Sequence, residues 1–308
     1  MPRTDALHLG LMLSALGLAY ILPFELLLIA YAVLGPAHYL TEISWLHDRR
    51  YFLSAKSIAM LLAAVAVAAV SVSDAPDSGL LIWIAFVGAA LSIGGISWAQ
   101  RAVLAAILVA VTVALVTGRD FVAVAAVLLP TLIHVSVFTL IFMMLGAYRS
   151  GSRWQMALVV VYLAAVALIL LVPPGAIPRS MPLAQIGYRY FGGVAPALGQ
   201  VLHVPDLTFD SRSTGLLSFV YTYHYLNWFI KADVIGWRRI PARRLGAIVA
   251  LSAAATGLYF YDYAMGFTVL LALSLLHVVL EFPLNTLSMR QLAGIAAQGF
   301  GRQARATS

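Results

Sequence analysis

The sequence contains no cysteine, which excludes disulfide bonds, iron–sulfur clusters and thiolate metal sites within this chain. Charged residues are also scarce, since Asp, Glu, Lys and Arg make up only 10% of the 308 residues. Soluble domains carry about 25% charged residues, whereas 62% of this chain is hydrophobic and its mean hydropathy is +0.94. These proportions exclude an ordinary soluble domain and predict an all-α, polytopic integral membrane protein.

A helix needs about 20 apolar residues to cross a bilayer. The segment 6–46 is the least distinct part of the pattern, because it fits either two spans or one long span with a re-entrant piece around Pro23. We expect residues 1–308 to form a single membrane domain. Counting 6–46 as two, ten segments approach the required length: 6–22, 24–46, 53–73, 79–99, 102–117, 121–147, 154–173, 214–231, 245–263 and 265–287.

Lys and Arg outnumber Asp and Glu by 19 to 12, and the net charge is +7. In a membrane protein such an excess marks the cytoplasmic side, so we do not interpret it as a surface for nucleic acid. With ten spans and a cytoplasmic N-terminus, 15 of the 19 basic residues fall on the inner side. This distribution predicts cytoplasmic N- and C-termini, an extracytoplasmic interfacial loop at 174–213 and a cytoplasmic tail at 286–308.

Ionisable side chains are rare inside a bilayer, because each costs about 2.5–3.5 kcal/mol at the centre of a span. All three glutamates fall inside predicted spans, and so do four of the seven histidines. Glu25 lies near the outer end of its span, where we expect an ordinary interfacial or helix-terminal acid. The other six residues form the candidate metal site: His38, Glu42, His134, His224, His277 and Glu281.

Spacing and depth both predict that these six residues meet. His38 and Glu42 are four residues apart, as are His277 and Glu281, and this separation places two residues on one face of a helix. The four histidines lie in the second, sixth, eighth and tenth spans, all of which run toward the cytoplasm in the predicted topology. At about 1.5 Å per residue, they lie within about 10 Å of a common level. We therefore expect one site in the middle to cytoplasmic half of the membrane.

Imidazoles and carboxylates without sulfur suit iron, zinc, manganese or copper(II). Iron is the first expectation, because a metal at membrane depth faces lipophilic substrates that usually react through activated oxygen. The expected partners are a lipophilic small molecule, such as a carotenoid or a lipid, and the membrane lipids. In an oxygenase of this kind Tyr223, Tyr225 and Asn227 are expected as catalytic residues that orient substrate or oxygen.

The segment Gly35–Glu42, which reads GPAHYLTE, resembles the Pro-His-Gly-x-x-Asp element of the Brp/Blh family. Members of that family are bacterial, all-helical membrane β-carotene dioxygenases in which a few intramembrane histidines bind iron. Here Tyr39 stands where the family has glycine, Glu42 replaces the aspartate, and His224 alone represents a late pair of histidines. The resemblance covers about a dozen residues and implies an iron oxygenase of the bacterial inner membrane.

Two other functional classes use the same residues. In an ion- or proton-coupled transporter, buried His and Glu side chains relay protons or bind a cation. In a haem-binding or assembly protein, a pair of histidines would supply axial ligands, or the polar residues would only pack the helices. The sequence does not decide the substrate, the number of metal ions or the oligomeric state.

Overall fold

The computed structural model describes residues 2–71, 78–117, 132–175, 211–231, 236 and 240–306. The first half contains α1 (Arg3–Ile21), α2 (Pro23–Ile29), the π-helix η1 (Ala30–Leu34), α3 (Gly35–Asp48), the 3-10 helix η2 (Arg50–Phe52), α4 (Lys56–Ser71), α5 (Ser78–Leu91) and α6 (Trp98–Thr117). The second half contains α7 (Thr139–Ser150), α8 (Arg153–Leu171), α11 (Ser211–Ile230), α13 (Ala242–Tyr261) and α14 (Tyr263–Ala306). Within these ranges there is no β-strand, only one isolated bridge between Leu53 and Ile93, so the all-α prediction is confirmed.

Six of the described helical segments are long and apolar enough to cross a membrane. They are Arg3–Ile21, Pro23–Asp48, Leu132–Ser150, Arg153–Leu171, Ala242–Tyr261 and Tyr263–Ala297. Three shorter apolar helices lie at Lys56–Ser71, Gly79–Leu91 and Trp98–Val113. Each of the ten predicted spans overlaps a described helix, but the number of membrane crossings remains a prediction.

The segment 6–46 is divided in two. Leu22 has non-helical backbone angles (φ −136°, ψ 63°), and it separates α1 from α2. From Pro23 onward the chain stays helical to Asp48, with the π-helical turn η1 just before Pro36. Proline removes one backbone donor from a helix, and a π-turn is a common local adjustment near functional sites. The prediction of two spans agrees with this division.

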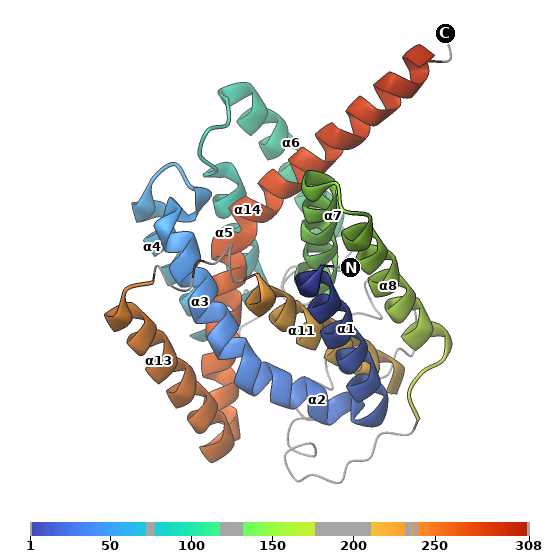
Figure 1. The fold of residues 1–308 in the computed structure, drawn as a ribbon. Helices are drawn as coiled ribbons and strands as arrows, with labels where there is room; N and C mark the ends of the chain where they lie inside the picture. The colour runs from blue at the N-terminus through green and yellow to red at the C-terminus, as the bar shows by residue number, and fades with distance from the viewer. Residues whose placement is uncertain are drawn as a thin grey trace.

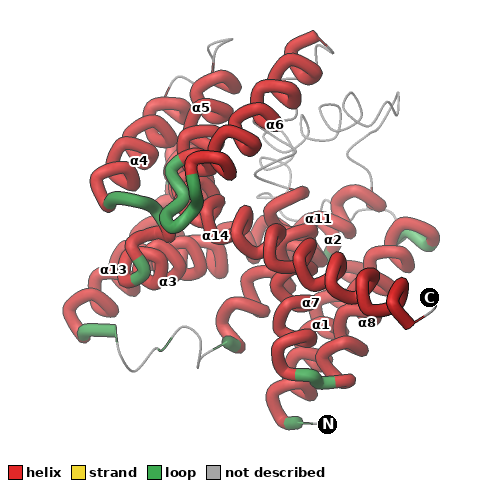
Figure 2. The backbone as a smooth tube through the Cα atoms, turned by 90° about the horizontal axis from the view of Figure 1, so that it is seen from above, coloured by secondary structure: helices red, strands yellow, loops and turns green. Residues whose placement is uncertain are grey.

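Helix α11 lies at the centre of the fold although it is the least apolar of the predicted spans. Twelve of its 20 residues are buried, many of them polar or aromatic. It packs against α1, α2, α3 and α8, while α14 packs against α3, α4, α5, α7 and α13 (Figure 1). Seen from above, α4, α5 and α6 gather on one side of the molecule and α1, α7 and α8 on the other (Figure 2). Helix α3 contacts both α11 and α14 and so joins the two central helices.

Helix α14 is longer than the sequence analysis predicts. The predicted span ends at 287, and 286–308 was expected as a tail, but one helix continues through Pro283 to Ala306 and projects beyond the other helices (Figure 1). The residues after 287 are rich in Ala, Gln and Arg, which favour helix without needing a lipid environment. Most of the predicted loop at 174–213 lies outside the described residues, as does 118–131, the early part of the sixth predicted span.

Two glycines near the junction between α13 and α14 should differ sharply in how well they tolerate a side chain. A Cβ added at Gly266 would collide with the backbone of Tyr259, whereas one added at Gly257 would meet nothing within 4 Å. We expect Gly266→Ala to lower the free energy of unfolding by about 1–3 kcal/mol, because backbone atoms cannot move aside. Gly257→Ala serves as the control, since alanine is the better helix former. Thermal unfolding in detergent tests this, and equal midpoints for both variants would contradict the packing.

Candidate metal centre

Four histidines from four separate helical segments meet at one point. His38 lies on α3, His224 on α11 and His277 on α14, while His134 lies in the π-helical segment 132–138 that leads into α7. None of the four is more than 8% exposed. One side-chain nitrogen from each lies within 4.8 Å of the other three. The structure therefore brings together all four of the predicted histidines.

The four imidazoles form a closed ring. His38 is next to His224 (centroids 4.7 Å apart) and His277 (5.3 Å). His134 is next to the same two, at 4.9 and 5.0 Å. Neighbouring rings are inclined by 70–80°, so each ring turns an edge toward its neighbours. This arrangement aims ring nitrogens at a shared centre.

The inner nitrogens are close enough to share one metal ion. Nε2 of His224 lies 3.1 Å from Nε2 of His38, and Nε2 of His277 lies 3.1 Å from Nε2 of His134. With metal–nitrogen bonds of about 2.1 Å, two nitrogens at this separation subtend an angle of about 95° at the metal. A neutral imidazole has one donor and one acceptor nitrogen, and a metal ion would use the acceptor of each ring. The donor set and its spacing therefore fit a metal ion.

Polar side chains lie beside the outer nitrogens of two of the rings. Nδ1 of His224 lies 2.7 Å from Oγ1 of Thr139, and Nδ1 of His134 lies 3.2 Å from Oε2 of Glu281. Asn285 in turn donates to Oε2 of Glu281 at 3.3 Å. Metal-binding histidines commonly bond a hydroxyl, carbonyl or carboxylate through the nitrogen that does not face the metal. The hydrogen bond of Thr139 holds Nε2 of His224 toward the centre, whereas Glu281 contacts Nδ1 of His134 at ion-pair distance without hydrogen-bond geometry.

The two glutamates take different positions. Glu42 follows His38 by one turn of α3, and its Oε2 lies 3.1 Å from the inner nitrogen of His38, as the spacing predicts. Glu281 was expected to act with His277, one turn earlier, but it contacts the outer nitrogen of His134 on another helix. Glu281 also forms a side-chain hydrogen bond with Glu42, so the two carboxyl groups lie next to each other beside the four histidines. Glu42, beside the inner nitrogen, is placed to complete the ligand set.

Two tyrosines, Tyr39 and Tyr225, close one side of the site, and the sequence predicted only Tyr225 there. The ring of Tyr39 stacks on His277, with centroids 4.3 Å apart, and its hydroxyl lies 2.6 Å from that of Tyr225. Tyr225 also packs against His38 at 5.1 Å. Tyr225 was predicted at the site, whereas Tyr39 was noted only for replacing a glycine. Tyr39 could have been predicted at the site, because it directly follows His38 on a helix that was expected to be buried.

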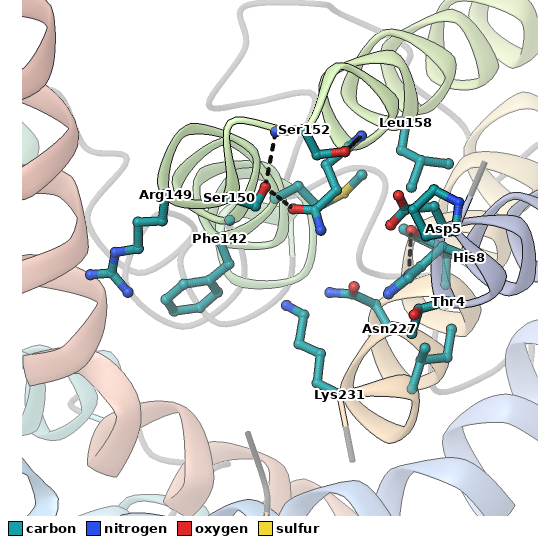
Figure 3. A pocket seen from close by; sticks show the side chains of 16 residues that line it. Thr4, Asp5, His8, Phe142, Arg149, Ser150, Ser152, Leu158, Asn227 and Lys231 are labelled. Carbon is teal, nitrogen blue, oxygen red and sulfur yellow. Dashed lines mark hydrogen bonds between the residues drawn. The ribbon is translucent and has the colours of Figure 1, made fainter. Parts of the chain in front are cut away.

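The other two predicted catalytic residues lie elsewhere. Tyr223 and Asn227 line a cavity of about 700 Å³ whose lining includes none of the four clustered histidines. The hydroxyl of Tyr223 lies 3.4 Å from Nδ1 of His8 (Figure 3). The structure therefore places Tyr223 and Asn227 on the lining of this cavity, while Tyr225 lies against the histidines.

Glu25 lies in the first turn of α2, as expected of a helix-terminal acid, and it is 1% exposed. Neither of its carboxylate oxygens has a hydrogen-bond partner among the described residues. It is thus a buried carboxylate outside the centre.

No family model, no curated protein and no solved structure matches this chain. The resemblance of Gly35–Glu42 to the Brp/Blh element therefore remains a prediction.

The contact between Glu281 and His134 predicts a loss of metal affinity when the carboxylate is removed. We expect Glu281→Gln to weaken metal binding by about 10- to 100-fold, because outer contacts of this type orient a ligand and raise its basicity. Competition with a chelator of known affinity measures the change. Glu25→Gln is the matched control, as it neutralises a buried glutamate away from the centre. Equal affinity of Glu281→Gln and the wild type would refute the supporting role.

Proposed function

We propose that this chain is a metal-dependent oxygenase of the bacterial inner membrane, which binds iron and acts on a lipophilic substrate such as a carotenoid or a lipid. The observation that carries the proposal is the buried ring of four imidazoles, supplied by four helical segments, with Nε2 atoms facing each other at 3.1 Å. Four imidazoles that meet in a buried place are costly to desolvate, and a metal ion bound to one nitrogen of each ring would help to offset that cost.

Iron is our first choice among the metals that imidazole and carboxylate ligands accept. The reason is placement, because a metal buried among apolar helices would face lipophilic substrates that usually react through activated oxygen. Four imidazoles around one iron leave room for Glu42 and for a further ligand. Manganese and copper(II) accept the same donors, so metal analysis decides among them.

The surroundings of the centre fit a lipophilic substrate. Iron held by His38, His134, His224 and His277 would supply activation of molecular oxygen. Around it the chain offers mainly aromatic and apolar surface, including Tyr39, Tyr225 and Trp228 next to His38. The hydroxyls of Tyr39 and Tyr225 hydrogen-bond to each other, and Tyr39 also hydrogen-bonds to Ser274, so these polar groups are held in place beside the centre. The buried, apolar walls exclude bulk water from this region.

We extend the proposal to the membrane arrangement, with about ten spans and cytoplasmic N- and C-termini. Six segments meet the length and hydropathy expected of a span. Helix α11 is shielded by α1, α2, α3 and α8, so it does not need an apolar surface of its own. The distribution of 15 of the 19 basic residues on one side supports the orientation.

A haem site is less compatible with the geometry than a directly coordinated metal. Axial ligands of a haem approach the iron from opposite faces of a flat macrocycle. Here neighbouring nitrogens subtend about 95° by the same bond lengths, and the rings contact each other directly. A transporter could use the same buried residues to relay protons or bind a cation, but it would not consume oxygen. Oxygen uptake therefore separates a transporter from an oxygenase.

Metal analysis of the purified protein tests the proposal. We expect about one equivalent of iron per chain, oxygen uptake when β-carotene is added in detergent, and loss of both in His38→Ala/His277→Ala. The matched control is His8→Ala/His47→Ala, which also removes two histidines, both outside the ring. Helical circular dichroism must be equal in the two variants. A wild type that stays metal-free after anaerobic reconstitution with iron would contradict the proposal.

A further inference from the structure

A second feature of the molecule, the cavity of about 700 Å³ that Tyr223 and Asn227 line, has no role in the proposed metal chemistry. It lies where α1 and α8 begin and where α7 and α11 end, so four helix termini surround it. Its volume is within the range of about 300–1,000 Å³ typical of small-molecule sites. The cavity is therefore large enough for an organic ligand.

Two polar groups, the amide of Asn227 and the ammonium of Lys231, face the same space in this cavity. Asn227 is 5% exposed, and its Oδ1 has no hydrogen-bond partner among the described residues. Figure 3 shows the side chains of Asn227 and Lys231, from the end of α11, extending into the same space. None of the ion pairs within the described residues includes Lys231. A buried amide and an unpaired ammonium together indicate a ligand with an anionic or strongly polar group.

The other charged residues of the lining are Arg149 and Asp5. Arg149 hydrogen-bonds to Gln291 on α14 and extends away from the centre of the cavity (Figure 3). Asp5 also lines the cavity, where both it and Lys231 act electrostatically on His8. Glu42 and Glu281 influence Lys231 electrostatically from the side of the metal centre, but neither lines the cavity. Lys231 is therefore the cation that a ligand in this cavity would meet.

The rest of the lining includes apolar surface. Phe142, Met143, Leu158 and Ile230 contribute to the walls, and the ring of Phe142 lies 5.9 Å from Nζ of Lys231. A site that combines one cation and one amide with apolar walls matches a molecule with a charged head and a hydrocarbon part. We propose that this cavity binds the anionic head, a carboxylate or a phosphate, of a single-chain amphiphile, with Lys231 and Asn227 as its polar contacts.

Titration of the purified protein with octanoate, octyl phosphate and neutral octan-1-ol, followed by native mass spectrometry, tests this site. These probes share a chain length and differ in the head, so the tighter anion identifies whether a carboxylate or a phosphate is preferred. We expect one saturable anion site, with affinity at least about tenfold above that of octan-1-ol, since the ammonium pairs only with a charged head.

Variants assign the binding to the cavity. Lys231→Met should weaken anion binding by about tenfold or more, Asn227→Leu by several-fold, and Lys231→Arg should retain most of it. Arg149→Met, which removes a cation from the rim, should change affinity by less than about threefold. Retention in Lys231→Arg also shows that a loss in Lys231→Met is not misfolding. Equal binding of octan-1-ol, equal losses in Lys231→Met and Arg149→Met, or no saturable binding would overturn the proposal.

The result does not depend on the metal centre. Iron content is measured on the same preparations, and we expect Lys231→Met to retain the metal of the wild type while it loses the anion. Loss of anion binding in His38→Ala/His277→Ala, with Lys231 intact, would contradict a separate site. A metal-free wild type that still binds octanoate through Lys231 would leave this inference standing and remove only the oxygenase.

Discussion

The structure depends on one constraint, which is that polar side chains buried at membrane depth need partners. The four imidazoles become each other's partners because they meet at one point, where each ring packs against two others at nearly right angles. Because the rings come from α3, α11, α14 and the segment before α7, the site fixes how these four parts of the chain lie relative to each other. A metal ion at the shared centre would therefore act as a cross-link between segments more than 200 residues apart in sequence, such as those of His38 and His277.

The central helices and their local irregularities follow from the same constraint. Helix α11 carries His224 and is too polar to face lipid, and the fold surrounds it with other helices. The π-helical turns lie just before Pro36 and around His134, where a shift of register adjusts the direction of a ligand. The same helix, α11, presents Tyr223 and Asn227 to the cavity at the helix ends. One helix thus separates the metal centre from a polar cavity, and Lys231 at its end lies between the two.

Much of this arrangement can be predicted from the sequence, because an ionisable residue within an apolar span is conspicuous. Equal depth indicated the meeting of the four histidines, and helical spacing indicated the contact between His38 and Glu42. The pairing of Glu281 with His134 is a tertiary contact between helices, which spacing within one helix cannot reveal. Thr139 was missed for the same reason, because its contact is with Nδ1 of His224 on another helix. The cavity was missed since helix ends from four parts of the chain create it.

X-ray absorption at the metal edge of the purified, metal-loaded protein tests the central claim most directly. We predict nitrogen ligands at about 2.1 Å, with multiple scattering from about four imidazoles per metal and intensity from a further oxygen ligand such as Glu42. Glu281→Gln should keep the number of imidazoles, since its contact is with an outer nitrogen. A spectrum with one or two imidazoles per metal, or with the pattern of a haem macrocycle, would contradict a centre built from His38, His134, His224 and His277.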